Sequence, residues 1–400
     1  MKKYFDHLTN LRPNETLSLH AMRGIGILFV LMVHFCHTLA KEAFNVNPEL
    51  FGFFTNFTSV LDAFFVLSGY LISDQLFSAH KKGKDMSFKK FFRNRVLRIF
   101  PGYYFFITTI IILTFLQILL IDNVIQKKGI TDVAVLSDFA SLKARFSSSW
   151  ADFVFVGNYI KGIHDHTWSL SVEEQFYLFI PFFMTFVLFK HPKHTMTFLG
   201  ILYFIAILFR IFYFYSDAVI IKSEKMYYST ETRYDAFIVG IMIAYWGQYK
   251  QDFLKSKLFN SSVALSIFAV LLSINHLIPR NDSFLSVTFK YNVINIGYGF
   301  LLIFCLHTKE RAYDTKLGSI YKSTIVFLAR TSYTVYLWHL TISSILGNSG
   351  LITKPENIHP GVYYVTYFLI YCIISFLVGF VLYRFIEYPF ILKKEQLKKV

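Results

Sequence analysis

The chain has 400 residues, of which 54% are hydrophobic and only 16% are charged. A soluble domain carries about 25% charged residues, so this composition excludes an ordinary soluble globular protein. The formal net charge of +15 does not indicate nucleic acid binding, because the apolar runs leave no soluble basic domain to carry such contacts.

Long apolar runs follow one another along the whole chain. A helix needs roughly 20 mostly apolar residues to cross a bilayer core of about 30 Å. We therefore predict an all-α polytopic membrane protein with about ten transmembrane helices, which form a single membrane domain over residues 1–400. The expected spans are approximately 17–39, 55–76, 101–121, 171–190, 196–215, 233–249, 259–279, 290–307, 326–346 and 361–384. Because the first sixteen residues are polar and no small-residue cleavage site follows the first run, we expect this run to be retained and not cleaved as a signal peptide.

The segments between the expected spans differ in basic charge. With an even number of spans both termini share a side, and the segments on that side hold 26 of the 40 Lys and Arg residues, against 12 in the opposite segments. Cytoplasmic segments carry the excess of Lys and Arg, so we predict that both termini are cytoplasmic. The same rule predicts a basic cytoplasmic loop at about 77–100 and a large outer loop at about 122–170, which is long enough to fold over a site.

The first expected span carries ionisable residues at helical spacing. His34 lies eleven residues after Arg23, which is close to three turns or about 16 Å along one face, and His20 and His37 extend this stripe. Ionisable groups inside a span are costly and usually mark function. One interpretation is an inert polar seam that bonds to neighbouring helices. The other is a cleft in which His34 accepts a proton, because neutral imidazole can deprotonate a hydroxyl near pH 7.

The basic loop also has two interpretations. Lys and Arg alternate with Phe, Val and Leu between Lys81 and Arg98, which is typical of an interfacial amphipathic helix that meets anionic lipid. The alternative is a clamp for a phosphorylated cofactor at the cytoplasmic face. Arg95 and Arg98 would supply it, because guanidinium groups form forked hydrogen bonds with phosphate. Both interpretations can hold together.

A polar string opens the fourth expected span. It contains Trp168, Ser169, Glu173 and Glu174, and it continues into the apolar run. A serine cap and an acidic residue in the first turn would give part of this pattern a purely structural role. They do not account for two acids inside the span, so we treat these carboxylates as candidate functional groups.

Three further polar features lie near the expected spans. Arg233 and Asp235 open the sixth span, and we expect that they can pair with each other. His339 follows an amphipathic string in the ninth span. His164 and His166 precede the fourth span, but two histidines without a third ligand at suitable spacing predict no metal site.

Several of these sequence motifs occur together, in an order that is also found in a known protein family. They are Arg23-Gly24 with His34, the segment 62–72 around Ser68, Arg95-x-x-Arg98, the segment 168–177, Arg233-x-Asp235, Ser332-Tyr333 with Trp338-His339, and Glu387-x-Pro389. The chain thereby resembles acyltransferase family 3, the membrane O-acyltransferases that modify surface polysaccharides, over nearly its whole length. The strings around Ser68 and Trp168 are its specific parts. Many members also carry a soluble C-terminal hydrolase-like domain, and this chain resembles the stand-alone form.

The resemblance implies an enzyme that transfers an acyl group, most often acetyl, to a hydroxyl of a cell-envelope carbohydrate. O-antigen of lipopolysaccharide, capsule, exopolysaccharide and peptidoglycan precursor are all candidate acceptors. Acetyl-CoA or another acyl-CoA would be the donor substrate, and no permanently bound cofactor is expected. The expected partners are therefore membrane lipid, acyl-CoA and a free or lipid-linked glycan. The expected location is the bacterial cytoplasmic (inner) membrane.

The residues suggest a mechanism in which His34 deprotonates the acceptor hydroxyl, which then attacks the thioester. Glu173 or Glu174 would orient the imidazole, as the third member of a catalytic triad does. The candidate residues for binding donor or acceptor are Arg23, Arg95, Arg98, Ser68, Trp168, Ser169, Arg233, Asp235 and His339. An alternative from another class is a transporter or flippase of lipid-linked sugars or small anions, which would use the same charged cleft without covalent chemistry. A membrane sensor whose histidines report pH is a further alternative.

Overall fold

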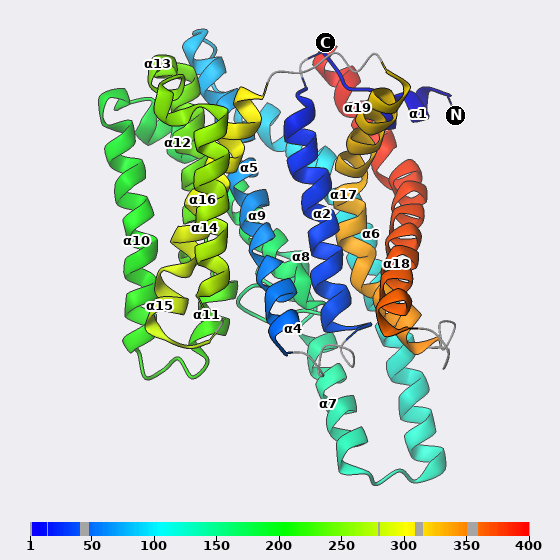
Figure 1. The fold of residues 1–400 in the computed structure, drawn as a ribbon. Coiled ribbons are helices and arrows are strands. Elements are labelled where there is room, and N and C mark those ends of the chain that lie inside the picture. The colour runs from blue at the N-terminus through cyan, green and yellow to red at the C-terminus, as the bar shows by residue number, and fades with distance from the viewer. Residues whose placement is uncertain are drawn as a thin grey trace.

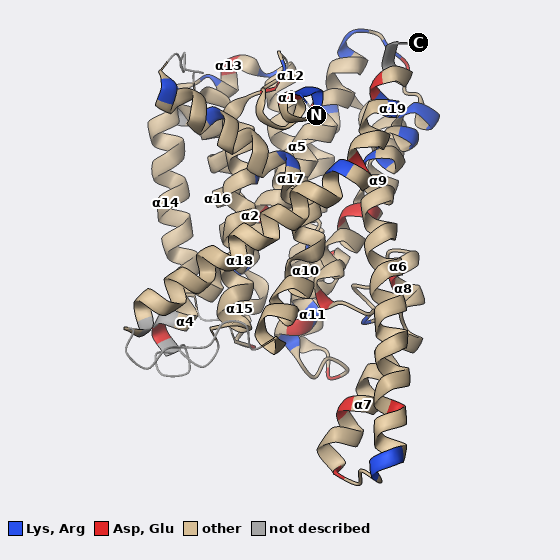
Figure 2. Ribbon diagram, turned by 90° about the vertical axis from the view of Figure 1, so that its right-hand side faces the viewer, with Lys and Arg blue, Asp and Glu red and all other residues tan. Residues whose placement is uncertain are grey.

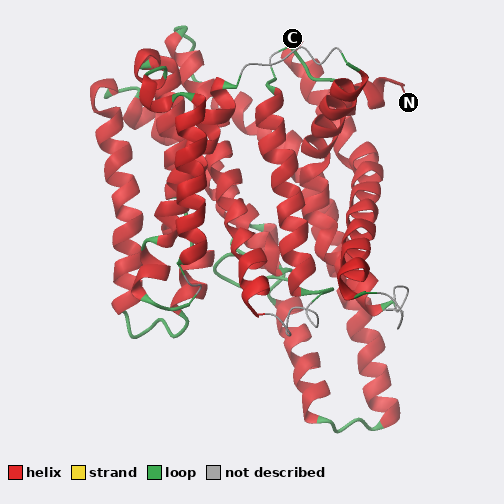
Figure 3. Cartoon of the chain, viewed as in Figure 1, coloured by secondary structure: helices red, strands yellow, loops and turns green. Residues whose placement is uncertain are grey.

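The computed structural model describes residues 2–13, 15–40, 48–278, 281–308, 315–349 and 359–399. These residues are mainly helical, and no strand occurs among them (Figure 3). Each of the ten predicted apolar runs coincides with a helix. These helices are α2 (Leu17–His37), α5 (Val60–Lys81), α6 (Phe88–Lys128), α9 (Trp168–Phe183), α10 (Thr195–Tyr215), α12 (Asp235–Tyr249), α14 (Ser261–Leu277), α16 (Lys290–His307), α17 (Lys316–Asn348) and α18 (Pro360–Leu382).

Shorter helices connect and flank this bundle. They are α1 (Lys2–Thr9), α4 (Pro48–Thr55), α7 (Val133–Ser147), α8 (Trp150–Phe153), α11 (Lys222–Tyr228), α13 (Gln251–Leu254), α15 (Phe284–Thr288) and α19 (Tyr388–Lys399). Both chain termini lie at the same end of the bundle (Figure 1). Lys and Arg gather at this end, which we call the basic end (Figure 2).

Within the described part of the chain, five helical stretches are long and apolar enough to cross a membrane by length and composition. They are Leu17–His37, Phe51–Lys81, Phe88–Lys128, Pro192–Tyr215 and Gly361–Leu397. The chain is therefore a membrane protein. Several other helices are short for a span, since α9, α12 and α14 have 16, 15 and 17 residues. The count of about ten spans and the cytoplasmic termini stay predictions.

The segments predicted as two large loops are mostly helical. In the basic segment 77–100, α5 continues to Lys81 and α6 begins at Phe88, where the Ser87 side chain accepts a hydrogen bond from the Lys90 amide. At its other end α6 continues to Lys128 and stops at Gly129, whose φ of 60° favours glycine. There α6 and α7 form a hairpin that projects beyond the bundle, away from the basic end (Figure 1). Thus the first part of segment 122–170 is a helical hairpin.

The close packing of α5 against α12 fixes the centre of the bundle. Gly69 of α5 lies against the backbone of Phe237, and Gly240 of α12 lies against the carbonyl oxygen of Val66, so that a Cβ atom at either glycine would overlap with backbone. Small residues allow helices in membranes to approach this closely. On its other sides α5 contacts α2 and α16, while α2 also packs along α17. These contacts bring α2, α5, α12, α16 and α17 together at the centre of the bundle.

This contact generates a test of the fold. We expect Gly240→Ala to lower the melting temperature in detergent, because the added methyl group overlaps with backbone that cannot move aside, and such overpacking costs about 1–3 kcal/mol. Gly200→Ala is the matched control, since no atom lies within 4 Å of a Cβ at that position in α10. Its melting temperature should stay equal or rise, because alanine favours the helix over glycine. Equal melting temperatures for the two variants would contradict the packing.

Candidate active site

Among the residues that the structure describes, two adjoining cavities are lined by most of the polar residues identified above. The larger, with a volume of about 580 Å³, is lined by His34 and is called the His34 cavity. The smaller, of about 130 Å³, is lined by Arg23, Arg95 and Arg98 and is called the arginine cavity. Leu61 and Tyr336 line both, so the two cavities meet at these side chains.

A buried ion pair forms one wall of the His34 cavity. Arg233, at the start of α12, donates to Asp62 of α5 at 2.7 Å, and both side chains are almost fully buried. The guanidinium group also lies over aromatic rings, at 5.4 Å from the ring centre of Trp168 and 4.4 Å from that of Tyr291. Cation–π contacts of this kind hold a desolvated arginine in place. The wall is therefore rigid, polar and aromatic.

His34 lies beside a second buried histidine. The ring centres of His34 and His339 are 4.8 Å apart, and His339 is in turn 5.2 Å from His166. His34 and His166 line the His34 cavity, whereas His339 lines neither cavity. His37, one turn after His34, also lines the cavity and contacts the Val33 carbonyl oxygen at 2.9 Å.

Three arginines line the arginine cavity, together with two glutamates, Glu173 and Glu387. Arg23 comes from α2, and Arg95 and Arg98 come from α6 near the basic end. Among the residues that the structure describes, none of these three arginines forms an ion pair with Asp or Glu. Arg95 lies over the ring of Tyr177 at 5.2 Å from its centre. Guanidinium groups without carboxylate partners make a ready site for an anionic ligand.

Glu173 belongs to the arginine cavity and not to His34. It accepts hydrogen bonds from Ser68 at 2.5 Å and from Tyr177. Glu174 follows on the next position of α9 and lines neither cavity. The expectation that Glu173 or Glu174 orients His34 therefore does not match this geometry, because α9 turns the first carboxylate towards α5 and the ring next to His34 is that of His339.

Tyr336 forms the partition between the two cavities. Its hydroxyl lies 2.5 Å from that of Ser169 and donates to the His166 carbonyl oxygen at 2.8 Å. These contacts tie α17 to the start of α9. Leu61 of α5 completes the partition. Access between the cavities therefore depends on the positions of the Tyr336 and Leu61 side chains. Two hydrogen bonds hold the Tyr336 ring in place.

Comparison with known proteins identifies the family of this chain. A family model described as an acyltransferase domain (Acyl_transf_3) matches residues 16–384. The chain belongs to acyltransferase family 3. It is thus an acyltransferase, and the two cavities lie within the matched region.

Two relatives illustrate the similarity. O-acetyltransferase OatA of Staphylococcus aureus is 26% identical over 339 residues, covering 82% of this chain and 52% of that protein. Another Staphylococcus aureus protein, provisionally named an O-acetyltransferase, is 25% identical over 394 residues, covering 95% of this chain and 58% of that protein. The chain therefore spans about half the length of the curated relatives it matches. No solved structure matches it.

The acyltransferase contains a second buried ion pair, which corrects the pairing expected from the sequence. Arg233 does not pair with Asp235, because Asp235 binds Arg210 of α10 while Arg233 binds Asp62. Arg210 also donates to the Thr288 carbonyl oxygen at 3.1 Å. Residues two apart at the start of a helix point in different directions, so each of these charges meets a partner from another helix. Asp235 lines neither cavity and ties α12 to α10.

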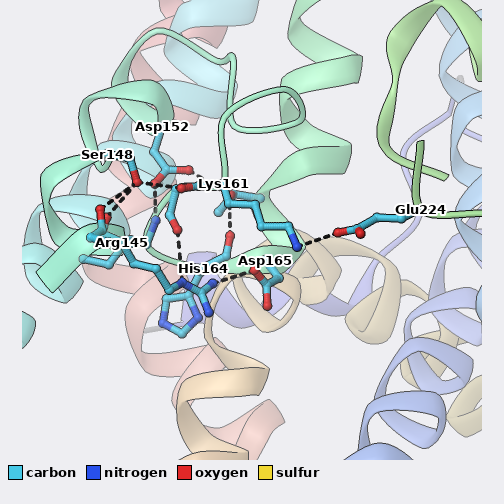
Figure 4. A network of polar contacts seen from close by, with 11 residues as sticks. Arg145, Ser148, Asp152, Lys161, His164, Asp165 and Glu224 are labelled. Atoms are coloured by element: carbon cyan, nitrogen blue, oxygen red, sulfur yellow. Dashed lines mark hydrogen bonds and ion pairs between the residues drawn. The ribbon is translucent and has the colours of Figure 1, made fainter. Parts of the chain in front are cut away.

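The segment between α8 and α9 closes one side of the His34 cavity through a polar network (Figure 4). Arg145 of α7 pairs with Asp165 at 2.5 Å, and Lys161 pairs with Glu224 of α11 at 2.5 Å. Asp165 and Glu224 line the His34 cavity. The second half of the predicted outer loop thus lies at the mouth of this cavity.

Most of the sequence-predicted residues line one of the two cavities, whereas Glu174, Asp235 and His339 line neither. His34, Trp168 and Arg233 line the His34 cavity. The arginine cavity is lined by Arg23, Ser68, Arg95, Arg98, Ser169 and Glu173. Sequence reasoning missed the roles of Asp62 and Arg210, although each is an ionisable residue inside an apolar run, and that signal would have identified both. It also gave no role to Tyr336, because a tyrosine in an aromatic-rich string is ordinary.

The network at the cavity mouth predicts a pH dependence of stability. Burial and then the positive charge of Arg145 lower the pKa of His164 to about 4, against about 6.5 for an unfolded histidine. The unfolded chain therefore binds this proton more readily, and the contribution of neutral His164 is fully present above about pH 6.5 and is lost as the pH falls towards about 4. We expect the melting temperature of wild type to fall more steeply over this range than that of His164→Gln.

The control for this comparison is an exposed histidine. His194, between α9 and α10, is exposed, so His194→Gln should keep the pH dependence of wild type. Melting temperatures of the three proteins in one detergent, measured between about pH 7 and about pH 4, give the answer. A His164→Gln protein with the wild-type slope would show that another group controls the acid sensitivity.

Proposed function

We propose that this acyltransferase transfers an acetyl group from acetyl-CoA to a hydroxyl of a cell-envelope carbohydrate. The observation that carries the proposal is the meeting of the arginine cavity and the His34 cavity at Leu61 and Tyr336. One cavity suits a polyanionic donor, and the other offers a base beside polar and aromatic walls. The relatives named O-acetyltransferases support acetyl as the group transferred.

The donor would bind at the basic end. The phosphates of CoA carry several negative charges, and Arg23, Arg95 and Arg98 offer guanidinium groups without carboxylate partners among the described residues. The long pantetheine arm would then lead the thioester past Tyr336 towards His34. Only this uncharged arm needs to pass from one cavity to the other. It suits the apolar side chains of Leu61 and Phe65 near the partition.

The acceptor would bind in the His34 cavity. Trp168, Tyr227, Tyr228 and Tyr291 surround the cavity together with polar side chains. A sugar ring presents apolar C–H faces and polar hydroxyl edges, and pockets that combine aromatic faces with a few convergent polar groups suit such a ligand. His34 would remove the proton of the acceptor hydroxyl. The oxygen would form a bond with the acyl carbon, the C–S bond would break, and His34 would return the proton to the CoA thiolate.

We infer the orientation in the membrane from the charge distribution. The basic end holds both termini, and the excess of Lys and Arg on one side marks the cytoplasm. With about ten spans, the His34 cavity would face the outside of a bacterial cytoplasmic membrane. Acetyl-CoA is cytoplasmic, so the arginine cavity would face its donor, and the envelope glycan would reach the other cavity from outside.

The first prediction from this proposal concerns His34. We expect His34→Ala to lower acetyl transfer about a hundred- to ten-thousand-fold, because general base catalysis contributes this much. The assay uses purified protein in vesicles, radiolabelled acetyl-CoA and an envelope glycan extract, and follows label in glycan together with release of free CoA. His194→Ala, an exposed histidine, is the control and should keep full activity. Normal acetyl transfer by His34→Ala would contradict the role of His34 as the base. A wild-type protein that neither labels glycan nor releases CoA would favour the transporter or flippase alternative.

The second prediction concerns the donor side. In vesicles of defined orientation, acetyl-CoA should support transfer only when it reaches the basic end, as in inside-out vesicles. Arg95→Gln and Arg98→Gln should raise the KM for acetyl-CoA roughly ten- to a hundredfold, because a charge-assisted hydrogen bond contributes about 1.5–3 kcal/mol.

Lys255→Gln is the matched charge control for this experiment. Lys255 follows α13 and lines neither cavity, so its loss should leave the KM unchanged. Equal use of acetyl-CoA from both faces of the membrane, or an unchanged KM in both arginine variants, would remove the donor site from the arginine cavity.

A further inference from the structure

His339 is a fully buried residue whose place differs from the one expected from the sequence. Its exposed fraction is 0%, and it lines neither cavity, so it cannot contact donor or acceptor in this arrangement. Its imidazole instead lies behind that of His34, with ring centres 4.8 Å apart and planes tilted by 55°. A linear N–H···N hydrogen bond of about 2.9 Å between two imidazoles separates their centres by roughly 5 Å. The ring centres are therefore close to the separation that such a bond requires, although no hydrogen bond joins the two rings in this structure.

Backbone contacts determine which nitrogen of His339 carries the proton. Its Nδ1 atom lies 2.6 Å from the Tyr336 carbonyl oxygen. A carbonyl oxygen can only accept, so Nδ1 must be the protonated donor. In a neutral imidazole the Nε2 atom then carries a lone pair and no proton. This Nε2 atom is buried and has no hydrogen-bond partner among the described residues. A buried acceptor without a partner is costly, and the ring of His34, 4.8 Å away, is the neighbouring group that can turn to supply a donor.

We propose that His339 is the positioning residue of His34, and that its Nε2 atom accepts a hydrogen bond from the ring N–H of His34. This role is the one that a carboxylate fills in a catalytic triad, and neither Glu173 nor Glu174 is placed to fill it. The inference rests on the proposed acyl transfer and deepens it, since it names the group that fixes the tautomer of the base.

The other groups around His34 are less suited to this role. His37 is on the same helix and contacts the Val33 carbonyl oxygen. Tyr336 of α17 is held by Ser169 and by the carbonyl oxygen of His166. Asp62 of α5 is bound by Arg233, which lies just before α12.

His166 is another histidine near His34. Its ring contacts the ring of His339, which in turn contacts the ring of His34. Its Nε2 atom contacts the Leu337 carbonyl oxygen at 3.1 Å, and its ring centre is 5.2 Å from that of His339. His339 is thus the imidazole acceptor that the structure places in ring contact with His34.

The proton balance of the step leaves His339 unchanged. The bare nitrogen of His34 takes the hydroxyl proton while its other nitrogen, which always carries a proton, donates to Nε2 of His339. The C–O bond forms, the C–S bond breaks, and the same His34 nitrogen gives its proton to the thiolate. Throughout, Nδ1–H of His339 stays bound to the Tyr336 carbonyl oxygen. His339 therefore orients the base and stabilises its imidazolium form without exchanging a proton itself.

The test compares His339→Leu with His339→Gln. Leucine removes the acceptor, whereas the glutamine carbonyl can supply one near the former Nε2 atom. We expect His339→Leu to lower kcat for acetyl transfer about ten- to a thousandfold with unchanged KM for acetyl-CoA, and His339→Gln to recover most of kcat. His276→Leu is the matched control, because His276 of α14 also has Nδ1 against a backbone carbonyl oxygen and an Nε2 atom without a partner among the described residues.

A second measurement does not depend on activity. In protein labelled with ¹⁵N-histidine, solid-state NMR should find His34 as a single neutral tautomer in wild type and as a mixture in His339→Leu. An unchanged tautomer in His339→Leu would overturn the proposal, as would a kcat within twofold of wild type. Equal impairment of His339→Gln and His339→Leu would also overturn it. If wild type transfers no acetyl group at all, the proposed function fails, while the tautomer of His34 still decides the role of His339.

Discussion

The ion pair between Asp62 and Arg233 is the interaction on which the centre of this molecule depends. A charged side chain inside a span costs about 2.5–3.5 kcal/mol or more, so each of these residues needs the other. Asp62 lies on α5 and Arg233 lies just before α12, so the position of α12 along α5 determines whether they meet. Gly69 and Gly240 permit the close approach that this register requires. Breaking either partner would leave a buried charge unpaired, which is far more costly than the pair is stabilising.

From this fixed contact the two cavities follow. Arg233 faces the ring of Trp168, which begins α9, and α9 in turn places Glu173 against Ser68. The same pairing of α5 with its neighbours thus shapes a cationic pocket at the basic end and an aromatic pocket at the other. Tyr336 separates them through its bonds to the start of α9. In the proposed reaction this separation keeps the charged part of the donor away from the acceptor, while a narrow uncharged arm can join the two.

Much of this arrangement could be predicted from the sequence, since apolar runs report helices directly. The shared face of Arg23 and His34 also follows from helical spacing, although the two residues line different cavities. Helical spacing could not identify the partner of a buried charge, because that partner comes from another helix. Arg233 and Asp235 are two residues apart in sequence, yet they bind Asp62 and Arg210. Likewise Glu173, expected to orient His34, accepts hydrogen bonds from Ser68 and Tyr177, because a residue's position along a helix does not reveal which neighbour it faces.

A histidine suits the place beside His34 better than a carboxylate does. Asp62 and Asp235 are buried against an arginine each, whereas the buried Asp152 is held by hydrogen bonds from Thr167 and the Ile163 amide. A carboxylate next to His34 would need a cation or such donors of its own, or it would bear the full cost of burial. His339 avoids this cost, because a neutral imidazole tied to the Tyr336 carbonyl oxygen presents a lone pair without a net charge. An uncharged acceptor of fixed orientation can therefore hold a catalytic base inside a membrane protein, where an unpaired charge would destabilise the fold.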